Sequence, residues 1–153
     1  MTLEYQYKST SELTKPDIED MINIFNLVFP GWGGEQDFRW KFSLNPYGNS
    51  QHMIARDEGH AVGTVSFWRN DLDAVKSYQC VDLGVLPSHQ RLGIFGDIVP
   101  KCIDNLRDSF VYTYPGSDTP SYLGFIKQGW LVNRRAPITW HHKSDLVKKF
   151  ESK

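Results

Sequence analysis

Hydrophobic and polar residues in the first third of the chain follow a pattern that predicts a strand and then an amphipathic helix. Residues 3–8 alternate between apolar and polar side chains, as an edge strand does. Thr14, Pro16 and Asp17 then supply a cap, a first-turn proline and an acidic residue three positions after the cap. The apolar positions beyond them recur every three or four residues and form one stripe: Ile18, Met21, Ile22, Phe25, Val28 and Phe29. The glycine-rich residues 30–34 are expected to end this helix.

Three strands with short turns are predicted in the middle of the chain. They span residues 51–56, 60–69 and 75–85, and their spacing indicates an antiparallel meander. Residues 38–44 precede them and match both a strand and a helix face, so periodicity leaves this segment open.

A second amphipathic helix is predicted from Ile94. One face of it collects Ile94, Phe95, Ile98, Val99, Cys102, Ile103 and Leu106. Pro100 should kink this helix, because proline removes a backbone donor and clashes with the preceding turn. A strand over residues 110–114, a short helix over 121–128 and strands over 130–135 and 138–142 complete the order. This order predicts one mixed α+β domain over residues 1–153, with a parallel crossover between residues 75–85 and 110–114.

Composition and charge narrow the possible functions. The 153 residues carry 17 Lys plus Arg against 18 Asp plus Glu, so the balance argues against a nucleic-acid binder. No stretch approaches the roughly 18–20 apolar residues of a membrane span and no apolar signal region opens the chain, so a cytoplasmic protein without membrane contact is expected. Cys80 and Cys102 are expected to be reduced thiols, and no metal site is expected because neither has a second ligand at metal-binding spacing.

Residues 85–96 are the segment that points most directly to chemistry, because a strand end, a polar loop and a helix start follow one another there. The first amides of a helix lack internal partners and lie at the positive end of its dipole. Gly93 and Gly96 would let a phosphate approach the backbone closely. An ordinary strand-to-helix turn has the same features, and the spacing of a nucleotide P-loop or a dinucleotide fingerprint is missing.

Val85, Pro87, Gln90 and Gly93 form the pattern Val-x-Pro at a strand end and then Gln-x-x-Gly before an apolar helix. This pattern resembles the acyl-CoA signature of the GNAT superfamily of N-acyltransferases. Residues 125–130, Phe-Ile-Lys-Gln-Gly-Trp, are similar to a second family marker, and the order of elements is similar as well. The resemblance implies a GNAT-like fold, a central mixed and mostly antiparallel sheet of about six or seven strands flanked by about four helices, and acetyl-CoA as the co-substrate.

The same resemblance implies where the cofactor lies. Loop amides from Gln90 to Gly96 would bind the CoA pyrophosphate, and the strand end would hold the pantetheine as a pseudo-strand where the sheet splays toward residues 110–114. The implied cofactor-binding residues are Leu83, Gly84, Val85, Gln90, Arg91, Leu92, Gly93, Ile94, Phe95, Gly96, Asp118, Ser121 and Phe125. Two of them depart from the family pattern. Phe95 stands where the family has Gly or Ala, and Phe125 stands where many members have the tyrosine that protonates the leaving thiolate.

Asp82, Tyr114 and Tyr122 are the candidate catalytic residues. Acyl transfer to an amine needs a group that removes the ammonium proton, and Asp82 precedes the signature on the same strand. The alternatives are an ordinary strand carboxylate at Asp82 and a water held by backbone carbonyls as the base. Tyr114 or Tyr122 could protonate the thiolate, or both could be packing aromatics. The backbone amide near Val85 is the expected donor to the oxyanion.

The acceptor pocket is expected around residues 30–45, with Trp32, Phe38 and Trp40 as candidate substrate contacts. Trp32 is flanked by glycines and is expected in a mobile loop with little core to join, as a lid or substrate contact. A contact with a partner chain, as in a homodimer, is the alternative for Trp32. Phe38 also fits simple packing.

The leading functional hypothesis is an acetyl-CoA-dependent N-acetyltransferase that acts on a primary amine of a small molecule or amino sugar by direct attack in a ternary complex. The competing hypothesis is a catalytically weak or inactive acyl-CoA-binding regulatory module of the same fold, which the phenylalanines at positions 95 and 125 favour. A third hypothesis is an aminoacyl-tRNA-using transferase, which usually needs a longer chain built from two such domains.

Overall fold

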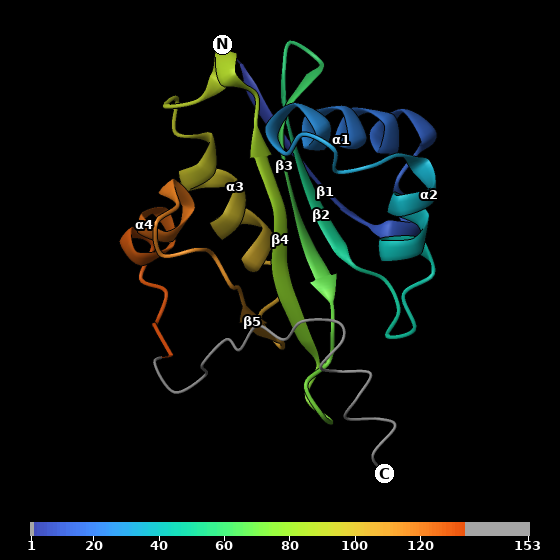
Figure 1. Cartoon of the computed structure of the whole chain (residues 1–153), viewed down its shortest axis with the longest axis vertical. Helices are drawn as coiled ribbons and strands as arrows, with labels where there is room; N and C mark the ends of the chain where they lie inside the picture. The colour runs from blue at the N-terminus through green and yellow to red at the C-terminus, as the bar shows by residue number, and fades with distance from the viewer. Residues whose placement is uncertain (1, 134–153) are drawn as a thin grey trace, which may run out of the picture.

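A five-stranded mixed sheet organises residues 2–133, the part of the chain that this computed structural model describes (Figure 1). Its strands are β1 (Leu3–Ser9), β2 (Gln51–Asp57), β3 (His60–Arg69), β4 (Ser77–Val85) and β5 (Phe110–Tyr112). They lie in chain order across the sheet, with β1 to β4 antiparallel and β4 paired to β5 in parallel. The predicted meander and the predicted parallel crossover are both confirmed.

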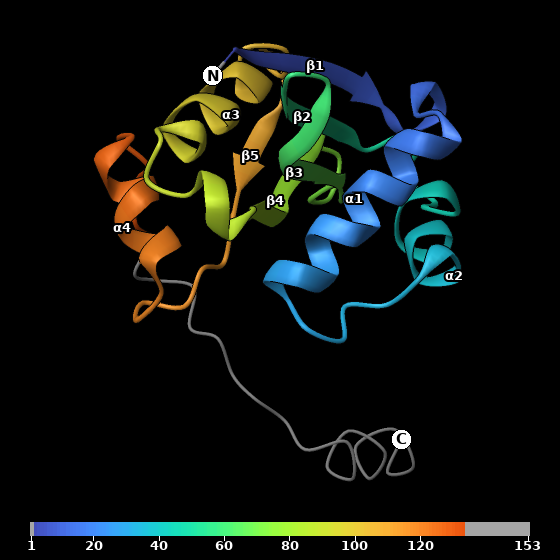
Figure 2. The same ribbon diagram turned by 90° about the horizontal axis from the view of Figure 1, so that it is seen from above.

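Helices cover both faces of this sheet (Figure 2). One face carries α1 (Lys15–Val28), α2 (Glu35–Phe38) and the π-helical turn η2 (Arg39–Ser43), and the other carries α3 (Ile94–Ile103) and α4 (Pro120–Lys127). Two short 3₁₀ turns, η1 (Thr10–Glu12) and η3 (Pro87–His89), follow β1 and β4. The mixed α+β class is therefore confirmed. None of the helices within residues 2–133 combines the length and the apolar character of a membrane span.

The helix start at Thr14 is confirmed in detail. The backbone N–H of Asp17 donates to Thr14 Oγ1 at 3.4 Å, and the backbone N–H of Thr14 donates to Asp17 Oδ2 at 2.9 Å.

Residues 38–44, the segment that periodicity left open, are mostly helical. Its two phenylalanines, Phe38 and Phe42, pack with ring centroids 4.9 Å apart and are each only 1% exposed.

The described strands are fewer than the predicted six or seven. Residues 130–133 form no strand, and the rest of the predicted strands at 130–135 and 138–142 lies outside the described residues. β4 begins at Ser77 because Leu72 and Val75 pair with each other in the turn before it.

A hydrophobic cluster lies on each face of the sheet. The cluster on the α3 and α4 face includes Phe67, Tyr78, Ile98, Cys102 and Phe125. The cluster on the α1 and α2 face consists of Met21, Phe25, Phe38, Phe42 and Ile54. Each fully buried phenylalanine stabilises the fold by roughly 1.5–3 kcal/mol relative to an exposed one.

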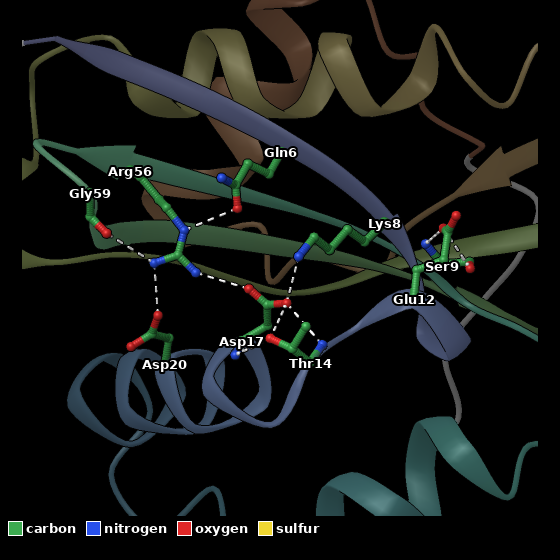
Figure 3. A network of polar contacts seen from close by, with 9 residues as sticks. All are labelled: Gln6, Lys8, Ser9, Glu12, Thr14, Asp17, Asp20, Arg56 and Gly59. Carbon is green, nitrogen blue, oxygen red and sulfur yellow. Dashed lines mark hydrogen bonds and ion pairs between the residues drawn. The ribbon is translucent and has the colours of Figure 1, made fainter.

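A network of ion pairs fastens α1 to β1 and β2 (Figure 3). Asp17 Oδ2 accepts a hydrogen bond from Lys8 Nζ at 2.6 Å, and Asp17 Oδ1 accepts one from Arg56 Nη2 at 3.0 Å. The other hydrogen bonds of Arg56 go to Gln6, Asp20 and the carbonyl of Gly59. Burial raises the pKa of Asp17, but the hydrogen bonds from Lys8 and Thr14 outweigh burial and lower that pKa to about 2.

His52 lies under α2 with no exposed surface. Its Nδ1 lies 2.9 Å from the Ser66 hydroxyl and its Nε2 lies 3.0 Å from the Thr10 hydroxyl. The ring also packs edge-on against Phe42, with the ring centroids 5.0 Å apart. Burial lowers the pKa of His52 from 6.5 to about 3, so the folded protein holds this histidine neutral.

His52 should make the fold sensitive to mild acid. The unfolded chain binds a proton at His52 below pH 6.5 and the folded chain does not, so stability present above pH 6.5 is lost as the pH falls toward 3. At pH 5 this loss is about 2 kcal/mol. Urea unfolding at pH 8 and pH 5 should show a steeper loss for the wild type than for His52→Gln, which keeps polar contacts but does not titrate. Parallel losses in the two proteins would contradict this account.

Candidate functional site

β4 carries a bulge at Asp82 and Leu83. Both residues stand opposite a single residue of β3, Val65. Asp82 has a φ of 49°, a left-handed value that costs a non-glycine residue about 1 kcal/mol or more, although aspartate adopts it more readily than most residues. Bulges redirect side chains and are frequent beside active sites. Here the Asp82 carboxylate reaches Trp32 and Lys41 on the α1 and α2 face.

β4 and β5 separate just before this bulge. Their parallel ladder ends at the pair of Gln79 and Tyr112, and the last link is the hydroxyl of Thr113, which donates to the carbonyl of Cys80 at 3.0 Å. From residue 81 to 85, no strand among residues 2–133 pairs with the β5 side of β4. The free edge is therefore five residues long and contains the bulge near its start.

The start of α3 lies beyond the end of this free edge. Arg91 and Gly93 adopt left-handed backbone with φ of 64° and 85°, and the chain then enters the helix. The amides of residues 94–96 belong to the first turn and have no acceptor four residues earlier within the helix. A Cβ added at Gly93 or Gly96 would meet nothing within 4 Å, so no packed side chain covers these two positions. This geometry suits an anion.

Two side-chain contacts fasten the loop between β4 and α3 to the sheet. Gln90 Nε2 donates to the carbonyl of Val85 at 3.1 Å. His89 Nε2 lies 3.3 Å from Asp57 Oδ2, and the hydroxyl of Ser88 lies 2.8 Å from His89 Nδ1. His89 is thereby a contact between the loop and β2.

Both carboxylate oxygens of Asp82 have partners. Trp32 Nε1 donates to Oδ1 at 3.1 Å, and Lys41 Nζ donates to Oδ2 at 2.7 Å. The side chain of Asp82 is 12% exposed and that of Lys41 is 24% exposed. Lys41 Nζ also lies 5.5 Å from the centre of the Phe42 ring. The predicted base candidate is thus an ion-paired carboxylate beside the free edge.

The loop that carries Trp32 is held in place. The Trp32 ring packs on Phe25 with centroids 4.7 Å apart, so it does have a core neighbour, contrary to the expectation from its glycine flanks. Asn26 Nδ2 donates to the carbonyl of Gly33 at 2.7 Å, and the backbone N–H of Gly33 donates to Asn26 Oδ1 at 3.3 Å. The helix therefore fixes the loop directly, and the indole N–H is aimed at Asp82.

Phe95 is accommodated by α4. A Cβ at Gly124 would collide with Phe95 Cε1, so the ring occupies the space that a side chain there would need. Phe95 also packs edge-on against Phe125, which in turn contacts Trp130. Phe125 is 5% exposed and belongs to this cluster. The two departures from the family pattern are thus neighbours in one aromatic contact.

The other predicted residues are placed as follows. Tyr114 is exposed after β5 and packs edge-on against Tyr112, whereas Tyr122 is half-buried on α4. Asp118 is exposed before α4, and Ser121 is half-buried with its hydroxyl 2.9 Å from that of Thr119. Phe38 is a core residue at 1% exposure and is not available to a substrate in this structure, whereas Trp40 is 74% exposed.

Three residues of the site did not stand out in the sequence. Lys41 lies between aromatic residues in the segment whose structure periodicity left open. Asn26 is an ordinary polar position within the span of the apolar stripe of α1, and Gly124 resembles any small residue in a short helix. Only the two aromatic residues at positions 95 and 125 hinted that α3 and α4 pack unusually.

A family model matches most of the chain: residues 18–128 match the acetyltransferase (GNAT) family. No protein of curated function matches the sequence. The matched residues include the bulge, the free edge, the start of α3 and all of α4.

Solved structures share the fold at low sequence identity. A GNAT family acetyltransferase from Streptococcus pneumoniae has a TM-score of 0.66 and 22% identity, over 93% of this chain and 99% of that one. An aminoglycoside acetyltransferase from an uncultured soil metagenomic sample, solved with sisomicin, has a TM-score of 0.69 and 13% identity, over 92% and 95%. AAC(6')-Iy, solved with the bisubstrate analogue CoA-S-monomethyl-acetylneamine, has a TM-score of 0.65 and 12% identity, over 92% and 98%.

Proposed function

Because this chain belongs to the acetyltransferase (GNAT) family, we propose that it transfers the acetyl group of acetyl-CoA to a primary amine of a small molecule or amino sugar. The amine would attack the thioester directly in a ternary complex. The observation that carries the proposal is the free edge of β4, which runs from the Asp82 bulge toward the open start of α3.

The residues at this edge suit acetyl-CoA. The amides of residues 91–96 would bind the pyrophosphate, because they belong to the loop and first turn at the positive end of α3. The Gln90 amide of the expected set already donates to the carbonyl of Pro87 at 3.4 Å, so Gln90 would contribute less directly. Residues 83–85 would bind the pantetheine through backbone groups that no strand within residues 2–133 uses on that side. When bound, acetyl-CoA supplies the activated acetyl group. Asp118 and Ser121, just before and within α4, are proposed as further contacts.

Asp82 is the proposed proton acceptor. An alkylammonium with a pKa of about 10.4 is neutral in only about one molecule per thousand near pH 7.4, which is a deficit of roughly 4 kcal/mol for a nucleophile. A carboxylate that receives the proton removes part of this deficit. The backbone amide near Val85 would stabilise the oxyanion. Tyr114 or Tyr122 would protonate the thiolate, since Phe125 has no hydroxyl.

The acceptor would approach from the α1 and α2 face, where the Asp82 carboxylate is directed. Trp32 would contact it through the indole that already reaches Asp82, and the exposed Trp40 is proposed as an outer contact. One structurally similar protein is named an aminoglycoside acetyltransferase, and another was solved with the bisubstrate analogue CoA-S-monomethyl-acetylneamine. Both support the choice of a small amine or amino sugar.

A binding module without turnover is the second candidate. It is favoured by the burial of Phe125 between Phe95 and Trp130 at the position of the expected acid. Such a module would bind acetyl-CoA and release no thiol above background.

A cytoplasmic location belongs to the leading proposal and is supported by the two buried free thiols, Cys80 and Cys102.

Substitution of Gly96 tests the cofactor site. Calorimetric titration should show that the wild type binds CoA and that Gly96→Glu weakens binding by at least about tenfold, or 1.4 kcal/mol, because the new carboxylate repels the pyrophosphate. Stability should be retained, since the position is open and an acidic residue suits the first turn of a helix.

Gly96→Gln is the matched control, with nearly the same size and no charge. It should bind CoA more tightly than the Glu variant. Absence of CoA binding by the wild type would refute both candidate functions. Thiol release from acetyl-CoA, measured with a panel of polyamines, amino acids and aminoglycosides including sisomicin, separates the enzyme from the module.

A further inference from the structure

The surroundings of the Asp82 carboxylate suit an ammonium ion, and an ammonium of the protein itself occupies them. Lys41 Nζ lies 2.7 Å from Asp82 Oδ2 and 5.5 Å from the centre of the Phe42 ring. Trp32 Nε1 holds the other carboxylate oxygen and so fixes the orientation of the carboxylate. A partly desolvated carboxylate beside an aromatic face is a strong arrangement for binding an alkylammonium.

This ammonium lies where the proposed function requires the acceptor. Asp82 forms the bulge at the head of the free edge, and η2 brings Lys41 to it from the α1 and α2 face. Lys41 is thus a primary amine within one hydrogen bond of the proposed proton acceptor. An external amine must displace it before reaching Asp82.

We propose that Lys41 is itself an acetyl acceptor and that the protein acetylates its own Lys41 Nζ in cis when acetyl-CoA is bound and no external amine is present. This inference rests on the proposed function, because it uses the same thioester and the same carboxylate. It assigns a modification site and a self-acetylation activity to the chain.

The reaction balances without a further reagent. Lys41 Nζ gives one proton to Asp82 Oδ2, and its lone pair then forms a bond to the carbonyl carbon of the thioester. The C–S bond breaks, and the CoA thiolate takes the second proton that the nitrogen loses. Asp82 releases its proton to solvent, so the products are Nε-acetyllysine, CoA and one proton.

Self-acetylation would also change the site electrostatically. An acetylated Lys41 carries no positive charge, so the ion pair with Asp82 is lost. The Asp82 carboxylate would keep its hydrogen bond from Trp32 and would be available to an ammonium from outside. Lys41 therefore competes with cationic acceptors until it is modified.

Two other lysines provide internal controls. Lys8 is matched to Lys41 in its surroundings: its side chain is 25% exposed and its Nζ donates to the buried Asp17 at 2.6 Å. Lys8 lies on β1, at the far edge of the sheet from the free edge of β4. Lys15 is 78% exposed and reports uncatalysed acetylation of an accessible lysine.

The experiment is to incubate the full chain with acetyl-CoA alone and to follow the acetylation of each lysine by peptide mass spectrometry. Acetylation of Lys41 should be at least about tenfold faster than that of Lys8 and Lys15, because the reacting groups are held together. The rate should saturate with acetyl-CoA, should not change on dilution of the protein, and should fall in Gly96→Glu. Lys41→Arg keeps a positive charge for the ion pair but has no ε-amine, so no acetyl group should be added at position 41.

Three outcomes would overturn the inference, and they differ in what else they affect. If CoA binds while Lys41 reacts no faster than Lys8, self-acetylation is refuted and the proposed function stands. If the Lys41 rate falls on dilution, transfer occurs between molecules and not in cis. If the protein does not bind CoA in calorimetry, the proposed function fails, and this inference fails with it.

Discussion

Replacement of Asp82 by asparagine is expected to lower turnover by a factor of about 10² to 10⁴ and to leave the affinity for CoA unchanged. The amide cannot accept the proton of the acceptor ammonium. It can still accept the hydrogen bond from Trp32, and asparagine tolerates the left-handed backbone at this position as aspartate does. The loss should therefore lie in proton transfer, with the bulge and the free edge intact.

A pH profile of thiol release distinguishes this role from a structural one. With the fastest acceptor of the amine panel, the Asp82→Asn enzyme should recover activity as the pH rises toward the pKa of the acceptor, because the amine then loses its proton without help. Asp71→Asn removes a carboxylate that is also ion-paired, to Arg69, and lies in the turn before β4. It should keep the wild-type profile. An unchanged profile in Asp82→Asn would remove Asp82 from the chemistry.

Asp17→Ala should lower the free energy of unfolding by about 3 kcal/mol, because it leaves the guanidinium of Arg56 partly buried without its better-shielded partner. Lys8 loses its partner in the same variant. Chemical denaturation at neutral pH measures the effect. Lys15→Ala is the control, since its pair with Glu19 is exposed on both sides and should contribute less than about 1 kcal/mol.

A double variant tests the cause of that loss. If the unpaired charge is responsible, Arg56→Met should cost less in the Asp17→Ala background than in the wild type, because it removes an orphaned charge there. Additive costs in the double variant would instead attribute the effect of Asp17 to the helix start at Thr14, where Asp17 also forms the capping box.

The elements of this fold could be predicted because each has a local cause. Thr14 and Asp17 cap α1. The strands β2 and β3 are bounded by the turn at residues 58–59, and both are buried along most of their length because helices cover both faces of the sheet (Figure 2). The pattern from Val85 to Gly96 could be recognised because its proline, glutamine and glycines stand at fixed spacing in the sequence. Phe38 was uncertain because a phenylalanine at such spacing fits both the core and a ligand wall, and only the packing against Phe42 decides.

The polar centre of the site could not be predicted in the same way. The contact between Lys41 and Asp82 joins residues 41 positions apart and depends on the bulge, which turns a strand carboxylate toward the helices. No local pattern announces a bulge in a strand whose bulged residue is not glycine. The sequence predicts a mobile Trp32 for a related reason. Two hydrogen bonds between Asn26 and Gly33 hold its loop in place. Asn26 is a single polar residue in a helix whose apolar face dominates the sequence pattern, so these bonds leave no signal there.

The contact between Phe95 and Gly124 bears on how this sequence can evolve. The ring fills the volume that a side chain at position 124 would occupy, so the two positions share one space between α3 and α4. Glycine or alanine at position 95 alone would remove the contacts of the ring with α4, at a cost below the roughly 3–5 kcal/mol of a fully buried site because Phe95 is only partly buried. A larger residue at position 124 alone would collide with the ring. The departure at Phe95 is therefore difficult to reverse one substitution at a time, and relatives are expected to change both positions together.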